Sequence, residues 1–225
     1  MRAGCWTSRR HEWTALRLAR TFVYNRTPVS KGQATRETIL DHAVDLARRV
    51  GLEGLTIGRL ATDLDLSKSG LFAHFKSKEA LQIQVLNNAA DLFVATVVRP
   101  ALAEPRGERR VRALFERWLA WERRAEGCIF VQASADLDGR DGPVRDRLVQ
   151  LQTDWMDVIA TTADGARREK HFKASVDVQQ FAQDLMGIML GYHHTARLLR
   201  HPEAETRARR AFETLVTHAR KPRTR

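Results

Sequence analysis

Apolar residues recur with the period of an α-helix along almost the whole chain from Thr35 onward. No stretch of useful length alternates between apolar and polar residues as a half-buried strand does. Gly51 closes the first of these helical stretches. Pro100 is expected to end a long helix that starts near Leu81, whereas Pro143 stands where a helix tolerates proline, in its first turn. The sequence therefore predicts an all-α fold of about nine helices.

Composition narrows the class of protein. A content of 43% apolar and 29% charged residues is typical of a soluble globular protein. The longest mostly apolar stretches, Leu92–Val98 and Leu185–Tyr192, are too short to span a bilayer. Two cysteines, Cys5 and Cys128, cannot build a disulfide framework or a cysteine-rich metal site. Since no secretory signal is visible, we expect a cytoplasmic protein without a membrane partner.

The net charge of +11 is concentrated at the two ends of the chain. Residues 1–34 carry seven Lys or Arg and one Glu, and residues 220–225 add four cations, whereas residues 35–81 carry seven charges of each sign. The turn-forming run at 25–32 separates the basic start from the helical part. We therefore predict an extension at 1–34, a domain at 35–81 and a larger domain at 82–225. The extension is either disordered or a basic arm that contacts DNA phosphates.

Two short helices are predicted within residues 56–75, only three residues apart. Helices this short are not stable alone, so the pair must pack against the helix at Thr35–Val50. Ala61 is small where the two helices would cross, and Ser67 is placed to cap the second one. The side chains expected to fill the shared core are Leu60, Leu64, Leu66, Leu71 and Phe75. This pattern is typical of a helix-turn-helix, although a plain three-helix bundle is the alternative.

Local charge favours the DNA-binding interpretation of this helix pair. Lys68, His74, Lys76 and Lys78 lie within thirteen residues, and no acid follows until Glu79. A cationic patch inside an otherwise neutral domain suits contact with phosphates better than charge at the chain ends does. The second helix can enter the major groove by its N-terminal end.

The segment Gly51–Leu81 closely resembles the tetracycline-repressor (TetR) family of transcriptional regulators, and the resemblance covers Thr35–Leu81. Its most specific part reads Leu-Ser-Lys-Ser-Gly-Leu-Phe-Ala-His-Phe-Lys-Ser-Lys-Glu-Ala-Leu. Residues 127–130 and 141–146 look similar to one common subset of the family's C-terminal domains. The resemblance implies a homodimer that binds a palindromic operator in double-stranded DNA, with a C-terminal domain for ligand binding and dimerisation. It implies a repressor that a small-molecule effector releases.

The resemblance also implies roles for single residues of the helix-turn-helix. Thr56 would cap the first helix and touch a phosphate. Lys68 and Ser69 would face base edges. His74 and Lys78 would each hold a phosphate, and the helix that starts at Lys78 would add backbone N–H groups.

Two residues depart from the family's pattern. Phe72 stands where the family usually has tyrosine, so a hydroxyl that would bond a phosphate is missing. Asp65 stands where the turn usually has glycine, and an aspartate tolerates positive φ at a higher cost than glycine.

Aromatic side chains are numerous in the larger domain, and most are expected in its core. Some could line an apolar effector pocket between helices. The candidates for this pocket are Trp118, Trp121, Phe130, Trp155 and His193.

A stripe of small residues falls at Gly187, Gly191 and Thr195, four residues apart. Such a stripe lets two helices approach closely. In the TetR family the last two helices of each subunit pack against their mates, so this stripe is a candidate dimer seam. Close packing within one subunit is the alternative.

No constellation of residues supports an enzyme, and none supports a cofactor or a metal. The acidic run at 136–142 has arginines where a calcium loop needs ligands, and His193 and His194 point to different helix faces. Two other functions stay open. One is a DNA-binding protein without a small-molecule effector, and the other is a helical ligand-binding protein with a vestigial DNA domain.

Overall fold

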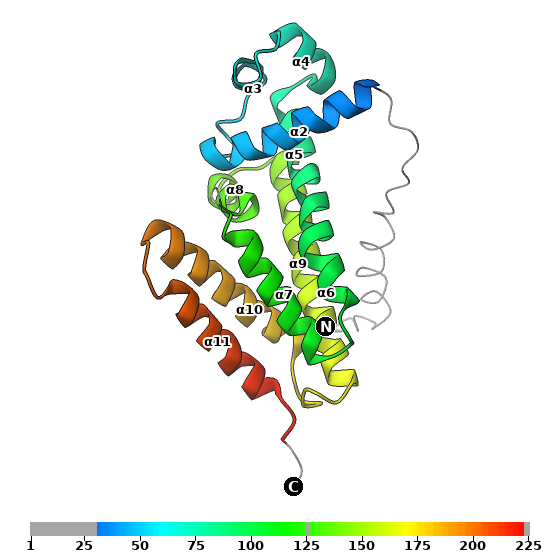
Figure 1. Cartoon of the computed structure of the whole chain (residues 1–225), viewed down its shortest axis with the longest axis vertical. Helices are drawn as coiled ribbons and strands as arrows, with labels where there is room; N and C mark the ends of the chain where they lie inside the picture. Colours follow the sequence, from blue (N-terminus) through cyan, green and yellow to red (C-terminus); the bar gives the residue numbers. More distant parts are fainter. Residues whose placement is uncertain (1–30, 125–126, 223–225) are drawn as a thin grey trace, which may run out of the picture. The chain divides into compact units, whose positions relative to one another are not determined.

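The computed structural model of this chain describes residues 31–124 and 127–222, and all of the regular structure there is helical (Figure 1). The elements are α2 (Lys31–Val50), α3 (Ile57–Asp63), α4 (Lys68–Phe75), α5 (Lys78–Phe93), the π-helix η1 (Val94–Val98), α6 (Arg99–Ala103), α7 (Glu108–Glu122), α8 (Ile129–Leu137), α9 (Pro143–Arg168), α10 (Val178–His193), the π-helix η2 (His194–Leu198) and α11 (Ala204–Ala219). Because α5, η1 and α6 follow one another directly, as do α10 and η2, the described residues form nine helical runs, and the all-α prediction is confirmed. The predicted extension at 1–34 lies outside the described residues up to position 30.

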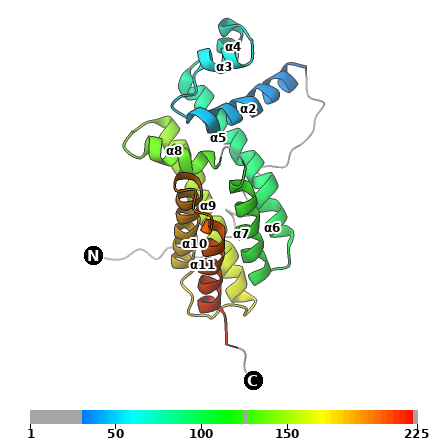
Figure 2. The same cartoon turned by 60° about the vertical axis from the view of Figure 1, so that its left-hand side comes forward.

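Contacts divide the chain into two compact units. Within the described residues, the first unit is built from residues 31–96 together with Leu119–Gln152, and the second from Val97–Trp118 together with residues 153–222. In the first unit α2 packs against α5, and α3 packs against α4 (Figure 2). The buried amide of Gln82 on α5 donates a 2.7 Å hydrogen bond to the Leu52 carbonyl, which anchors the connection between α2 and α3.

Pro100 does not end its helix, and the prediction that it would is wrong. The chain continues as a helix to Ala103, with Pro100 in the first turn of α6 and the π-helical segment η1 immediately before it. A proline inside a helix lacks a donor and clashes with a carbonyl in the preceding turn, and a π-helical segment changes the register where this conflict arises. The run Lys78–Ala103 is long and apolar enough to cross a membrane, but more than half of its most apolar window is buried in the protein, as in a core helix.

Pro143 opens α9 as the sequence predicts, yet α9 is longer than its large apolar residues indicate. The helix continues for 26 residues, to Arg168. Its second half is buried through Ala160, Ala163 and Ala166, which are at most 2% exposed. Because small alanines contribute little to an apolar pattern, the pattern in the sequence ends before the helix ends.

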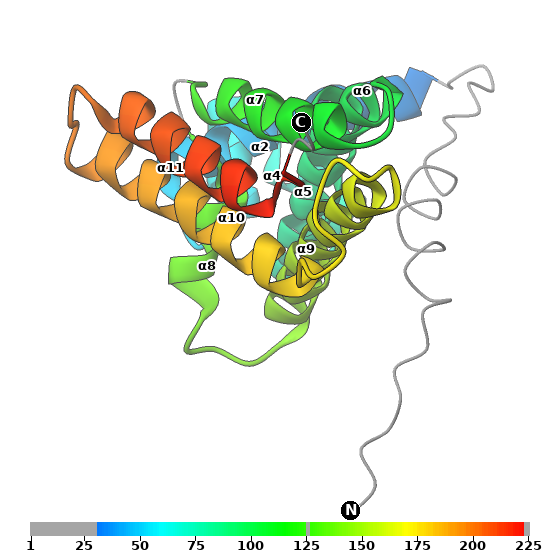
Figure 3. The same ribbon diagram turned by 90° about the horizontal axis from the view of Figure 1, so that it is seen from below.

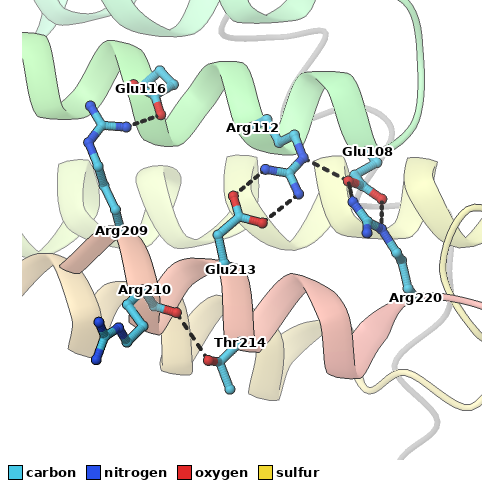
Figure 4. Close-up of polar contacts among 8 residues, drawn as sticks. All are labelled: Glu108, Arg112, Glu116, Arg209, Arg210, Glu213, Thr214 and Arg220. Atoms are coloured by element: carbon cyan, nitrogen blue, oxygen red, sulfur yellow. Dashed lines mark hydrogen bonds and ion pairs between the residues drawn. The ribbon is translucent and has the colours of Figure 1, made fainter. Parts of the chain in front are cut away.

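In the second unit α10 and α11 lie side by side along their lengths (Figures 1 and 3). Phe212 of α11 stacks on Phe115 of α7, with ring centroids 4.0 Å apart. Above this contact a ladder of ion pairs joins α7 to α11 (Figure 4). Glu108 accepts hydrogen bonds from Arg220 at 2.5 and 2.7 Å and from Arg112 at 2.7 Å, and Arg112 also binds Glu213 at 2.9 Å.

These ion pairs predict a loss of stability in acid. The hydrogen bonds from Arg220, and then those from Arg112, lower the pKa of Glu108 to about 2. A carboxyl with a lowered pKa in the folded state stabilises the fold above its unfolded pKa near 4.5, and this stabilisation is lost as the pH falls towards 2. After allowance for solvent screening, we expect a loss of about 1 kcal/mol between pH 6 and pH 3. Urea unfolding of Glu108→Gln should show a weaker pH dependence by this amount, whereas Asp141→Asn in an exposed loop should leave the dependence unchanged.

The start of α7 requires a glycine. Gly107 has φ +104°, and a Cβ atom placed there would lie 2.1 Å from Nδ1 of His171. The same Nδ1 accepts a 3.2 Å hydrogen bond from the backbone N–H of Glu108. His171 therefore caps α7 from the loop after α9, and the absence of a side chain at Gly107 allows its ring to approach.

Candidate DNA-binding site

The predicted pair of short helices is present as α3 and α4, and side chains cap both of them. Thr56 accepts a 3.1 Å hydrogen bond from the backbone N–H of Arg59 at the start of α3. Ser67 accepts a 3.2 Å hydrogen bond from the backbone N–H of Gly70 at the start of α4. These bonds satisfy amide groups that a helix leaves unpaired at its N-terminus, so both predicted caps are confirmed.

The turn between the helices adopts a left-handed conformation that glycine adopts more easily than other residues. Asp65 has φ 53°, as its position in the sequence predicts. The backbone N–H of the next residue, Leu66, donates a 2.9 Å hydrogen bond to the Ala61 carbonyl and closes the turn. The turn thereby fixes where α4 begins relative to α3.

Most of the predicted core of the helix pair is confirmed. Of the five predicted side chains, Leu60, Leu71 and Phe75 are at most 1% exposed, and Leu64 is half-buried. Leu66 was predicted to join them, and that prediction is wrong, because it is 45% exposed. It follows the left-handed Asp65 at the point where the chain reverses, which leaves its side chain outside the crossing of the two helices.

One face of α4 is exposed and carries its polar and cationic side chains. The exposed residues of this face are Lys68, Ser69, Phe72, Ala73 and His74, and Lys76 follows directly after the helix. Phe72 is 57% exposed, an unusual position for a large aromatic side chain on a small domain. The stem of Lys68 passes over Gly58 of α3, where a Cβ atom would lie 3.5 Å from the lysine Cε.

Lys78 begins α5, which Ser77 caps by accepting a 3.1 Å hydrogen bond from Ala80. The ammonium group of Lys78 is already paired, because Oε2 of Glu53 lies 3.2 Å from its Nζ. The same Oε2 lies 2.8 Å from Nη1 of Arg140. Although burial acts to raise the pKa of Glu53, the contacts with Lys78 and Arg140 hold it below its usual value. Glu53 is therefore ionised and shared between two cations.

Asp63 at the end of α3 ties the helix pair to α2. Its Oδ2 lies 2.5 Å from Nε2 of His42 and 2.9 Å from Nη2 of Arg49. These contacts, with the hydrogen bond from His42 first, lower the pKa of Asp63. The orientation of α3 is thus coupled to the last two turns of α2.

The sequence matches two known families of protein domains. Residues 39–85 match the family described as bacterial regulatory proteins, tetR family, and residues 107–212 match a tetracyclin repressor-like C-terminal domain. Together the two matches cover more than half of the chain. The chain belongs to the TetR family. It is a DNA-binding transcriptional regulator of the helix-turn-helix class.

Individual TetR-family proteins resemble this chain over different shares of its length. The class C tetracycline repressor of Escherichia coli is 46% identical over 46 residues, which span 20% of this chain and 21% of that repressor. A TetR-family regulator from Cytophaga hutchinsonii is 16% identical with a TM-score of 0.76, covering 88% of this chain and all of that one. AibR in complex with isovaleryl coenzyme A and operator DNA is 23% identical with a TM-score of 0.60, covering 76% and 94%. At these identities the two structures show a shared fold.

The residues predicted to line an effector pocket fall into two groups. Trp121 and Phe130 both contact Phe93 in the first unit, at centroid distances of 5.2 and 6.0 Å. Trp118, Trp155 and His193 belong to the second unit, where Trp118 meets Tyr192 edge-on at 5.8 Å. All four aromatic candidates are at most 8% exposed. The candidates thus belong to two aromatic clusters, each described within its own unit, and the effector pocket itself stays a prediction.

The two glycines of the small-residue stripe lie on α10 and face away from the rest of the described subunit, and Thr195 follows in η2. A Cβ atom at Gly187 or Gly191 would meet nothing within 4 Å. The hydroxyl of Thr195 donates a 2.8 Å hydrogen bond to the Gly191 carbonyl. Close packing within one subunit, the alternative reading of this stripe, is wrong for the described residues. Nearby apolar side chains are also exposed, namely Leu190, Leu198 and Leu199 at 42%, 71% and 58%.

Sequence reasoning missed two residues around this site. Glu53 lies 25 residues before the lysine that it contacts, and an acid in a loop carries no sequence signal of its partner. Arg48 looks like an ordinary cation in the last turn of a helix, yet it is only 6% exposed.

Proposed function

We propose that this chain is a homodimeric transcriptional repressor that acts in the cytoplasm, binds a palindromic operator and is released by a small-molecule effector. The exposed cationic face of α4 carries the proposal, because nothing in the described fold covers it and its helix is capped at the end that would enter the groove. The complex of AibR with operator DNA and isovaleryl coenzyme A supports both kinds of ligand.

In the proposed complex, residues of α4 and of the helix starts divide the contacts between bases and backbone. Lys68 and Ser69 read base edges from the first turn of α4. Thr56, His74 and Lys78 hold phosphates and set the position of the domain on the duplex. Phe72 offers apolar surface in place of a hydroxyl.

The outward-facing stripe on α10 supports the homodimer. Gly187, Gly191 and Thr195 leave room for a partner helix, and the exposed leucines nearby would be covered by it. A two-fold dimer would present two copies of α4 to half-sites about one helical turn apart.

A selection of genomic fragments by the purified protein tests the function. We expect one enriched motif with two-fold symmetry, whose binding a small molecule weakens. Failure to enrich any DNA would favour a ligand-binding protein with a vestigial DNA domain. A small molecule that binds tightly but never changes operator affinity would favour a DNA-binding protein that has no small-molecule effector.

Because Lys68 and Ser69 are proposed to contact base edges, we expect Lys68→Ala and Ser69→Ala to change the base sequence of the preferred half-site. Loss of a good base contact is worth about 1–3 kcal/mol at one base pair and little elsewhere. Repeating the selection with each variant measures this change, and Arg207→Ala on α11 is the control. An unchanged motif with both variants would remove Lys68 and Ser69 from base reading.

The proposed phosphate contact of Lys78 predicts opposite changes in DNA affinity for substitutions of Lys78 and of its ion-pair partner Glu53. Lys78→Ala should weaken binding to all sequences alike and lower the salt slope by about 1. Glu53→Gln should strengthen binding several-fold, because it frees Lys78 and removes a negative charge beside the DNA. Titrations at several salt concentrations measure both, with Arg207→Ala on α11 as the control. A loss confined to one base position for Lys78→Ala would contradict the phosphate role.

A further inference from the structure

A buried arginine with an unsatisfied edge lies at the end of α2. The side chain of Arg48 is 4% exposed, and its Nη1 donates a 3.1 Å hydrogen bond to Asp45. Its Nε and Nη2 are fully buried and have no hydrogen-bond partner among residues 31–124 and 127–222. These two groups form one edge of the guanidinium, with two parallel N–H bonds. An edge of this kind matches the two oxygens of a carboxylate.

The surroundings of Arg48 supply little that could satisfy this edge. Two guanidinium groups lie over the ring of Trp121, with Cζ of Arg48 5.0 Å and Cζ of Arg124 4.3 Å from its centroid. Burial and then the charge of Arg48 lower the pKa of Arg124, so the two cations act on each other. Asp45 and the buried Glu122 bring negative charge to this region, yet neither bonds Nε or Nη2 of Arg48.

A second buried donor lies in the same cluster. The indole Nε1–H of Trp121 is buried without a nitrogen or oxygen acceptor. The indole N–H instead contacts the sulfur of Cys128. A thiol sulfur is only a weak acceptor. Burial raises the pKa of this thiol to about 11, so the thiol stays protonated. Leaving buried donors unsatisfied is unfavourable, so these groups need an acceptor that the described residues do not provide.

We propose that Arg48 is the anchor of an effector site for a small organic carboxylate, which rests on the function proposed above. The carboxylate takes the Nε and Nη2 edge of Arg48 and lies near the indole of Trp121. Phe93 and Phe130, both 8% exposed and in contact with each other and with the Trp121 cluster, offer aromatic surface for the apolar body of the ligand. The ligand class is therefore an apolar acid, not a neutral or cationic molecule.

This site would connect an effector to DNA binding by a short path. Arg48 lies in the last turn of α2, and the neighbouring Arg49, together with His42, holds Asp63 at the end of α3. A ligand bound to Arg48 therefore contacts α2, the helix that orients the helix-turn-helix. All of these residues belong to the first unit.

Thermal shift and calorimetry on the DNA-free protein test the site. The probes are hexanoate, benzoate and phenylacetate, each beside its primary amide, with inorganic phosphate at equal ionic strength. We expect at least one carboxylate to raise Tm where its amide does not, and Arg48→Lys to weaken its binding by about tenfold or more, since lysine lacks the two-donor edge. Arg49→Met, one residue along and partly exposed, is the matched control and should keep the response.

Three results would overturn the proposal. They are carboxylates that act no differently from their amides, a response that survives in both Arg48→Lys and Arg48→Met, and a response to phosphate alone, which would assign the edge to a phosphate. Arg48→Lys retains the charge and keeps the test decisive where Arg48→Met fails to fold. Because operator binding is measured separately, a protein that selects an operator but ignores carboxylates loses this site and keeps its proposed function.

Discussion

In the proposed dimer, replacing Gly191 by leucine is expected to leave folded monomers that bind operator DNA weakly. The added side chain meets nothing within 4 Å of its Cβ in its own subunit, so the subunit has no reason to unfold. Leucine also favours a helix more than glycine does, by about 0.7 kcal/mol. In a two-fold dimer the same side chain enters the interface twice, and overpacking costs about 1–3 kcal/mol at each site.

Sedimentation, circular dichroism and operator titration on the same samples measure these effects. The dimer dissociation constant should rise by about tenfold or more, helical content should be unchanged, and operator affinity should fall because a single helix-turn-helix makes half of the contacts. Gly165→Leu on α9 is the matched control, since its Cβ also meets nothing within 4 Å. A fully dimeric Gly191→Leu protein with normal operator affinity would show that the stripe is not the seam.

Gly107→Ala is expected to cause a large loss of stability. The residue must keep φ near +104°, which an L-amino acid with a side chain adopts only with strain. Its new Cβ would also lie 2.1 Å from the His171 ring, so the ring must leave the N-terminus of α7. Together we expect a loss of about 3 kcal/mol in the free energy of unfolding.

A double mutant separates the two causes of this loss. In a background of His171→Ala, Gly107→Ala should cost only the backbone strain, about 1–2 kcal/mol. Gly165→Ala provides a control of opposite sign, because it lies in a helix with open space around it and should stabilise by about 0.5–1 kcal/mol. Equal losses in both backgrounds would mean that the ring contact contributes nothing.

The helix-turn-helix could be predicted from sequence because each of its signals is local. Thr56 and Ser67 are good caps wherever a helix starts beside them, and Asp65 marks a turn by its backbone preference. Leu66 was misplaced because a residue after a left-handed turn no longer follows the helical period. Pro100 misled because a π-helical segment, which has no sequence signature, let the helix continue past it.

The contacts that could regulate the site are not local, and sequence could not supply them. Glu53 and Arg140 come from loops 87 positions apart, and Arg48 meets Trp121 across 73 positions. The family resemblance assigns roles to residues of its shared motif, but these charged residues lie at its edge or outside it. Burial reveals them, since an arginine that is 6% exposed is conspicuous only once its neighbours are known.

Glu53 also has a consequence for how the proposed regulator would respond to the acidity of its surroundings. When Lys78 leaves Glu53 for a phosphate, Arg140 remains 2.8 Å from the same oxygen and continues to favour the ionised carboxylate. The carboxylate then has no need to gain a proton as the negatively charged DNA approaches. At this contact, we therefore expect operator binding by the proposed regulator to be insensitive to mild acidification.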